Sequence, residues 1–159
     1  MGKRIETRLI AAVLALFALT QVASAACQPG KIELAGERGV VSFDVSVADS
    51  FASRGRGLMF VKDMADSAGM LFIYGVTRPV SFWMKNTYIP LDMIFIDRRG
   101  VVKKVHANAV PHDTTSISSD VPIRSVLEIN GGLAEKLGIG PGTLVRHADL
   151  PQTGVAWPC

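Results

Sequence analysis

Two acidic residues, Asp92 and Glu128, stand out because each lies inside a run of apolar residues. Asp92 belongs to the segment LDMIFID and Glu128 to the segment VLEI, and both segments have the composition of buried β-strands. Two carboxyl groups that flank a glycosidic bond can act as general acid and general base. One hypothesis is therefore a small cell-envelope hydrolase that acts on glycans. The alternative, which we favour, is that each carboxylate satisfies a nearby cation or backbone donor, because Lys85 is available to Asp92.

A wider set of polar and aromatic residues could form a binding site for a small molecule. Such sites combine an apolar wall with a few convergent polar groups. The sequence offers this combination, although nothing in it proves that the residues converge. The predicted ligand-binding residues are Arg54, Arg56, Trp83, Lys85, Asn86, Asp92 and Glu128.

Other kinds of chemistry find little support in the motifs. The Gly-x-Ser-x-Gly motif of many hydrolases is absent, and the three histidines His106, His112 and His147 form no recognisable pattern. There is no His-x-x-x-His pair and no Asp-rich loop for a metal ion. Thioethers suit Cu(I), but methionines among apolar residues usually fill a core. We therefore expect no metal and no cofactor, and we assign to the core Met59, Met64, Met70, Met84 and Met93.

Residues 81–87 and 91–97 flank the turn 87–90, which predicts a β-hairpin. The shortest register pairs Lys85 with Asp92 across the two strands. Such a pair contributes up to ~1 kcal/mol if it is exposed. Trp83 and Ile94 share its face, so the pair either stabilises the fold or forms part of a binding site.

The remaining elements are short. Alternating apolar residues predict a half-buried strand over 40–47, and further strands are expected at 70–74, 101–107, 126–129 and 143–146. A fragile helix follows Asp49 or Ser50, and a second short helix over 131–138 has Asn130 as its predicted N-cap and Gly138 as its stop. A long polar loop covers 108–120. The fold class is mainly β, bordering on α+β: a compact antiparallel β-barrel-like domain with one or two short helices.

The N-terminus has the three parts of a secretory signal peptide. Three basic residues precede the apolar run Leu9–Leu19, and Ala23-Ser24-Ala25 supplies small residues for cleavage near Ala25. The apolar run is shorter than the ~20 residues that span a bilayer. Lipidation of Cys27 is disfavoured because Ser24 stands where an aliphatic residue is usual. An uncleaved anchor stays open. We expect a secreted or periplasmic protein with a signal peptide over 1–25 and one domain over 26–159.

Removal of residues 1–25 changes the net charge of the chain and keeps both cysteines. The whole chain has 159 residues and a net charge of +3. Residues 1–25 hold three of the 17 Lys and Arg and one of the 14 Asp and Glu, which leaves 14 positive against 13 negative residues. The near-neutral remainder has no basic run to attract nucleic acid, so we exclude that partner. In an oxidising compartment Cys27 and Cys159 are expected to form a disulfide.

The sequence resembles the family called domain of unknown function 192 (DUF192). The resemblance rests on RGLMFVKDM, GMLFIY, FWMKNTYIPLDMIFID and VLEINGGLAEKLGIGPGTLV, and it covers roughly residues 40–147. It implies a compact, mostly β domain that is often exported and has no established biochemical role. The Ser/Thr run within 113–125 departs from members that often carry an aromatic residue there. Asn130-Gly131-Gly132 replaces a commoner small-residue turn into the helix.

Together these observations predict an exported module that binds a small molecule or an envelope partner and is not an enzyme. We expect a monomer with no membrane span after the signal peptide is removed. The glycan hydrolase and a purely structural domain are the alternatives. In the structural alternative, the polar strand residues simply hold the barrel together.

Overall fold

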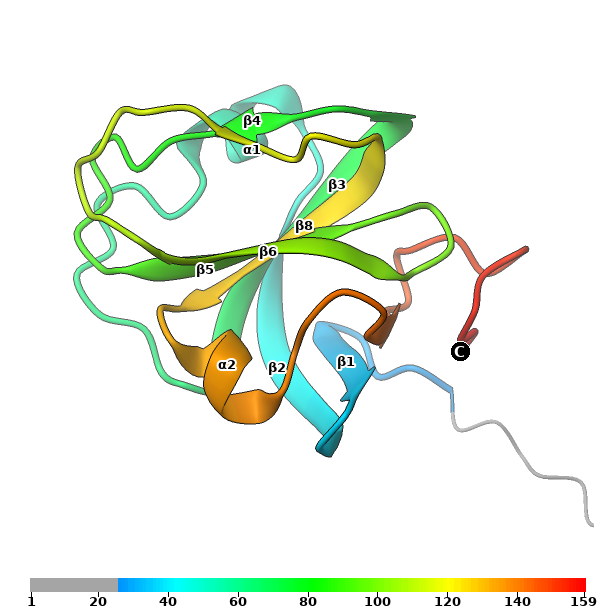
Figure 1. Ribbon diagram of the computed structural model, residues 1–159. Coiled ribbons are helices and arrows are strands. Elements are labelled where there is room, and N and C mark those ends of the chain that lie inside the picture. The colour runs from blue at the N-terminus through cyan, green and yellow to red at the C-terminus, as the bar shows by residue number, and fades with distance from the viewer. Residues whose placement is uncertain (1–25) are drawn as a thin grey trace, which may run out of the picture.

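The computed structural model describes residues 26–159, so the signal-peptide prediction for 1–25 lies outside the described residues. Within these residues the fold is mainly β, with nine strands and two short helices (Figure 1). The elements in chain order are β1 (Lys31–Gly36), β2 (Gly39–Ala48), α1 (Phe51–Arg56), β3 (Ala68–Arg78), β4 (Ser81–Phe82), β5 (Leu91–Ile96), β6 (Val102–Ala109), β7 (Ile117–Ser118), β8 (Ile123–Asn130), α2 (Leu133–Leu137) and β9 (Leu144–Arg146).

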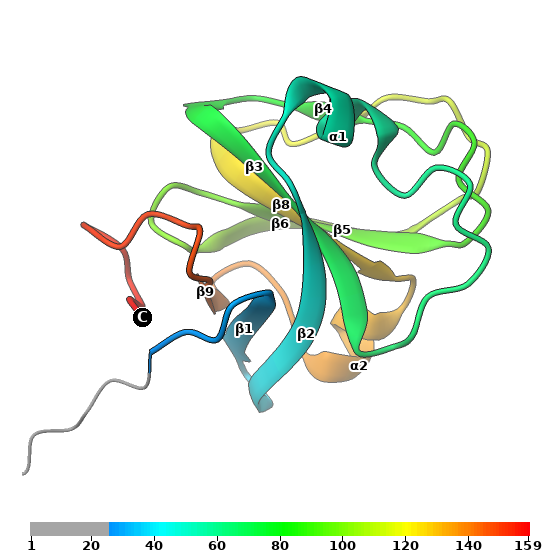
Figure 2. The same cartoon turned by 180° about the vertical axis from the view of Figure 1, so that it is seen from behind.

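Seven strands form one strongly curled sheet in the order β6-β5-β8-β3-β2-β1-β9. Its two ends meet where Val101 bridges Leu144, and the N–H of Val102 donates to the carbonyl of Thr143 at 2.9 Å. All pairs are antiparallel except β2 and β3, which are parallel and are joined through α1 (Figure 2). The predicted fold class, a mainly β barrel-like domain with two short helices, is confirmed as a curled half-barrel. Within residues 26–159, no helix has the length and apolar character needed to cross a membrane.

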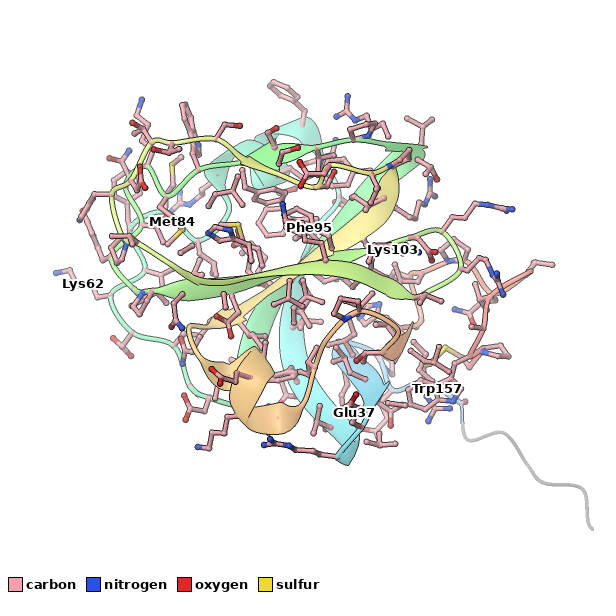
Figure 3. The ribbon with its side chains drawn as sticks, viewed as in Figure 1. Glu37, Lys62, Met84, Phe95, Lys103 and Trp157 are labelled. Carbon is pink, nitrogen blue, oxygen red and sulfur yellow. A yellow bond between two sulfur atoms is a disulfide. The ribbon has the colours of Figure 1, made fainter. Side chains whose placement is uncertain are left out.

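The central strands β3, β5 and β8 have apolar layers on both faces. One layer lies inside the curl and includes Leu34, Phe43 and Leu127. The other includes Phe72, Met84 and Phe95. Helix α1 and strand β4 lie over this side of the sheet (Figure 1). Met84 and Phe95 lie in the interior between these elements and the sheet (Figure 3). Burial on both faces explains why these strands have nearly continuous apolar sequences.

The predicted hairpin between 81–87 and 91–97 is wrong. In the first segment only Ser81–Phe82 form a strand, β4, and that strand pairs with β7 and not with the second segment. Residue 84 is held by the loop that follows β6, because its N–H donates to the carbonyl of Asp113 at 2.7 Å. Strand β5 pairs with β6 and β8 instead. The loop predicted over 108–120 thus contains β7 and covers one face of the sheet.

Both helices form where they were expected. Ser50 caps α1, since its hydroxyl accepts the N–H of Ser53 at 3.0 Å. Gly138 ends α2 in the left-handed conformation, with φ of 70°. The predicted N-cap, Asn130, is wrong, because Asn130 is the last residue of β8 and α2 begins after Gly132.

The two ends of the described chain are joined. Cys27 and Cys159 form the predicted disulfide, with their Cα atoms 5.0 Å apart. Near this terminal disulfide, the guanidinium of Arg146 lies 4.3 Å from the centre of the Trp157 ring at the periphery of the molecule (Figure 3). The C-terminal tail therefore packs against β9, although it has no regular secondary structure of its own.

Candidate functional site

Asp92 is fully buried and has a structural role. Its Oδ1 accepts the N–H of Asn108 at 2.8 Å and the N–H of Gly132 at 2.9 Å. Its Oδ2 accepts the N–H of Ala134 at 2.8 Å. These donors come from the end of β6 and the start of α2, so one carboxylate holds three elements together. Helix α2 has no side-chain cap of its own, and Asp92 provides this function from a neighbouring strand.

The predicted ion pair between Lys85 and Asp92 is wrong, because no ion pair of residues 26–159 joins them. The side chain of Asn130, predicted to cap the helix, instead donates to the carbonyl of Met64 at 2.7 Å and to Asp66 at 3.0 Å. The acid in β5 is therefore satisfied by backbone donors, as one of the two sequence-based alternatives proposed.

Glu128 lies on the other face of the same sheet. In the pairing of β5 with β8, Asp92 is opposite Ile129, whereas Glu128 is opposite Met93. Residues directly opposite each other share a face, and successive residues alternate between faces. The carboxyl groups of Asp92 and Glu128 therefore point away from each other. They cannot flank one substrate bond, so the acid/base pair proposed from the sequence is wrong.

The surroundings of Glu128 are mostly apolar. Its side chain is only 4% exposed, and Met70 and Met93 lie on either side of it in the neighbouring strands. No hydrogen bond or ion pair between described side chains reaches its carboxyl group. Burial raises the pKa of Glu128 from 4.5 to about 8, since the charged form loses its hydration and gains no partner. The acid is therefore mainly protonated at neutral pH.

Glu128 lies at one side of a cleft of about 230 Å³, which we call the Glu128 cleft. Helix α1 and the turn after it form one wall, β3 forms another, and β4 with the residues after it forms the third. The end of α1 approaches the sheet closely at Gly57, where a Cβ atom would lie 3.2 Å from the ring of Phe72. The lining residues are Arg54, Gly55, Arg56, Gly57, Leu58, Met59, Phe72, Tyr74, Ser81, Phe82, Trp83, Lys85, Thr87 and Glu128.

Three cations line this cleft, and two of them lie over aromatic rings. The guanidinium of Arg54 is 5.2 Å from the centre of the Tyr74 ring and donates to the carbonyls of Asp49 and Ile73. The Nζ of Lys85 is 5.2 Å from the centre of the Trp83 ring. Arg56 is exposed at the end of α1.

Tyr74 is the second buried titratable group of the cleft. Burial raises the pKa of its phenol, and the charge of Glu128 acts in the same direction. The guanidinium groups of Arg54 and Arg78 oppose this effect. The phenol therefore stays neutral at physiological pH.

Five of the seven predicted ligand-binding residues meet in the Glu128 cleft: Arg54, Arg56, Trp83, Lys85 and Glu128. Asn86 does not line it. Its backbone has φ of 57°, and its carbonyl accepts the N–H of Phe60 at 2.8 Å, so it shapes the adjoining loop. Asp92 is on the opposite face of the sheet.

The sequence did not single out Tyr74 and Thr87, which also line the cleft. Both are buried polar residues. The one available signal for Tyr74 was a hydroxyl at the end of the apolar strand segment 70–74.

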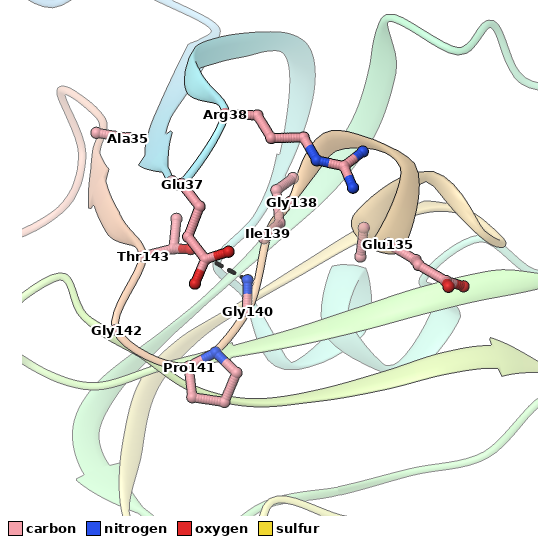
Figure 4. A pocket seen from close by; sticks show the side chains of 12 residues that line it. Ala35, Glu37, Arg38, Glu135, Gly138, Ile139, Gly140, Pro141, Gly142 and Thr143 are labelled. Atoms are coloured by element: carbon pink, nitrogen blue, oxygen red, sulfur yellow. Dashed lines mark hydrogen bonds between the residues drawn. The ribbon is translucent and has the colours of Figure 1, made fainter.

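A larger cleft of about 550 Å³ lies between the β1–β2 turn and the loop from α2 to β9 (Figure 4). Its charged side chains, Glu37, Arg38 and Glu135, are all exposed. Arg38 already donates to the carbonyl of Lys136 at 2.5 Å. This glycine-loop cleft has no buried charged group among its lining residues, so the smaller Glu128 cleft is the better candidate site.

Metal binding finds no support within residues 26–159, where no three His, Cys, Asp or Glu side chains gather as possible ligands. Met84 and Met93 are fully buried, and Met64 and Met70 pack against the same apolar layer. Met59 instead lines the Glu128 cleft. Four of the five methionines thus pack in the core, as the sequence suggested.

Residues 32–147 match DUF192, a family described as "Uncharacterized ACR". A crystal structure from Sinorhizobium meliloti 1021, described as a "putative transcription regulator", is 41% identical with a TM-score of 0.74, over 79% of this chain and 98% of that chain. A protein of unknown function from Novosphingobium aromaticivorans DSM 12444 is 41% identical with a TM-score of 0.72, over 74% of this chain and 84% of that chain. No curated protein matches the chain. On the extent of the family match, the chain belongs to the DUF192 family.

Proposed function

We propose that this protein is a binding module whose ligand is a small molecule held in the Glu128 cleft. The observation that carries the proposal is the carboxyl group of Glu128, which borders the cleft, is 4% exposed and receives no hydrogen bond from another described side chain. A buried polar group without a partner costs free energy. A ligand that hydrogen-bonds to this group recovers part of that cost.

The contrast with Asp92 supports this role. Asp92 is equally buried, but three backbone N–H groups satisfy it. A purely structural carboxyl group should resemble Asp92. Glu128 instead borders an open cleft with an exposed indole and two exposed cations at its mouth, contributed by Trp83, Lys85 and Arg56.

Hydrolysis is less well supported. A raised pKa suits a general acid, and Glu128 has one. However, Glu128 is the only acid among the described residues that line the cleft, so no second carboxylate is at hand as base or nucleophile. One relative is described as a "putative transcription regulator"; direct binding to DNA would require a basic surface, and residues 26–159 have 14 positive against 13 negative side chains.

The proposal includes export of the chain, with cleavage near Ala25. The three-part pattern of residues 1–25 supports it, as does the disulfide between Cys27 and Cys159, because disulfides persist in oxidising compartments. Mass spectrometry of protein recovered from the periplasm of an expression host is expected to give a chain that begins near residue 26. Recovery of the full-length chain from the cytoplasm alone would contradict export.

Binding can be tested with a fragment library and two-dimensional amide NMR spectra of residues 26–159. Hits are expected to shift the amide signals of Arg56, Trp83 and Lys85. Trp83→Ala is expected to weaken these hits, whereas the control Arg38→Ala in the glycine-loop cleft leaves them unchanged. Hits that cluster at the glycine-loop cleft, or a library without any hit near Glu128, would refute the proposal.

A further inference from the structure

We infer that the ligand of the Glu128 cleft is a small organic anion with a flat apolar body, whose acidic group binds Arg56 and Lys85 while another acceptor atom receives the O–H of Glu128. This inference rests on the proposed function and specifies the chemical class of the ligand. It follows from the charges at the cleft mouth, the apolar walls and the free acid inside.

The charge of the cleft is positive. Arg54, Arg56 and Lys85 line it, and Glu128 is the only acid among its described lining residues. The ion pairs of the described chain involve other residues, so none of these three cations is neutralised by a carboxylate. A ligand that carries a negative charge therefore meets three uncompensated positive charges, whereas a cationic ligand is repelled.

The three cations are placed differently. Arg54 is tied to backbone carbonyls and contributes a fixed field. Lys85 lies against the half-exposed indole of Trp83, and Arg56 is exposed at the last residue of α1. Lys85 and Arg56 are thus free to bind an anion, and a guanidinium can bind a carboxylate with two parallel hydrogen bonds.

The walls of the cleft favour a flat apolar body. Leu58, Phe72 and Phe82 line it, and Trp83 exposes half of its surface at the mouth. The volume of about 230 Å³ is below the ~300–1,000 Å³ of sites for drug-sized ligands. One ring with one acidic group fits this space better than a chain of sugars or a peptide.

Burial, and not a charged neighbour, keeps Glu128 protonated at neutral pH. Tyr74 on β3 lines the same cleft, with Arg78 over its ring, and Arg54, Arg56 and Lys85 face the cleft from α1 and from the segment after β4. Met70 and Met93 flank it in the sheet, and His106 on β6 lies next in the same row, opposite Met93. A protonated Glu128 donates a hydrogen bond to the ligand, whereas an ionised Glu128 would repel an anion.

Benzoate, benzamide and benzamidine provide a direct test, because they have nearly the same shape and carry negative, zero and positive charge. We expect benzoate to shift the amide signals of Arg56, Trp83 and Lys85 at the lowest concentration and benzamidine at the highest. Tighter binding of benzamide or benzamidine would overturn the inference and leave the proposed function intact. If none of the three shifts these signals, the inference fails, and the fragment library then decides the proposed function independently.

Two variants and one control sharpen the result. Lys85→Gln, at an exposed position, is expected to weaken benzoate about fivefold and to leave benzamide unchanged. Wild-type affinity for benzoate should fall about tenfold from pH 7 to pH 9, whereas Glu128→Gln should abolish this dependence on pH. His106→Gln serves as control and should keep the wild-type pH dependence. Unchanged benzoate affinity in Lys85→Gln would overturn the inference even if Glu128→Gln fails to fold.

Discussion

Replacing Glu128 by glutamine should stabilise the protein in alkaline solution and should leave its stability nearly unchanged in acid. Glutamine has nearly the same shape as a protonated glutamic acid but cannot ionise. In the folded chain burial raises the pKa of Glu128 to about 8, whereas the ordinary value in an unfolded chain is 4.5. Between these two values the folded state holds a proton that the unfolded state has already lost.

The sign and size of the effect follow from this difference. Stability falls with rising pH wherever the folded state binds more protons than the unfolded state. Below about pH 4.5 Glu128 is protonated in both states and does not lower the free energy of unfolding. Above about pH 8 it is ionised in both states, and the full loss of stability is present. At ~1.4 kcal/mol for each pH unit between 4.5 and 8, the free energy of unfolding falls by about 5 kcal/mol.

Urea unfolding of wild type and Glu128→Gln at pH 5, 7 and 9 measures this effect. Groups away from Glu128 contribute equally to both proteins and cancel in the difference, and Tyr74, whose pKa is raised from 10.0, stays neutral up to pH 9 in both. The advantage of the variant should grow by about 4 kcal/mol from pH 5 to pH 9. Glu37→Gln, at an exposed position, is the matched control and should show a flat difference. A difference for Glu128→Gln that stays within ~1 kcal/mol over this range would refute the reasoning.

Three further changes test the framework around the site. Asp92→Ala leaves three backbone N–H groups unpaired and should lower the free energy of unfolding in urea by about 3–5 kcal/mol, whereas exposed Asp63→Ala should change it by less than ~0.5 kcal/mol. A loss below ~1 kcal/mol for Asp92→Ala would contradict its structural role. Gly69→Ala places a Cβ atom 2.6 Å from the backbone oxygen of Glu128, so β3 must shift. Thermal unfolding should show that the free energy of unfolding falls by about 2 kcal/mol. Wild-type stability in this variant would contradict the close contact. Reducing the terminal disulfide, which spans 132 residues, should cost about 5 kcal/mol in the chain-entropy model, and an unchanged melting temperature would count against any stabilising role.

Local patterns in the sequence predicted most of the elements. Alternating residues located β2, and apolar runs located the centres of β3, β5 and β8. The helix signals at Ser50 and Gly138 were correct because a cap depends on a few adjacent residues. The hairpin failed because Phe82 pairs with β7 and the N–H of Met84 donates to the loop after β6, distant contacts that no local pattern reports.

The candidate site was predicted in part. Five residues selected for their chemistry do meet in one cleft, although they come from α1, the segment after β4, and β8. The roles of the two buried acids could not be separated, because both lie in apolar strands with similar sequences. Their difference depends on which backbone N–H groups come within reach, and these belong to other elements.

The sequence by itself determined the positions of the central strands, the helix caps, the DUF192 family and the pairing of its only two cysteines, because each depends on local pattern, composition or motif. The tertiary structure alone decided that β8 lies beside β5, in a register that turns Asp92 and Glu128 to opposite faces. On one face, the start of α2 supplies N–H donors to Asp92. On the other, apolar packing beneath α1 and β4 leaves Glu128 buried and without a partner. A buried carboxyl group thus becomes either a structural link or a candidate ligand-binding acid according to which backbone groups the folded chain brings to it.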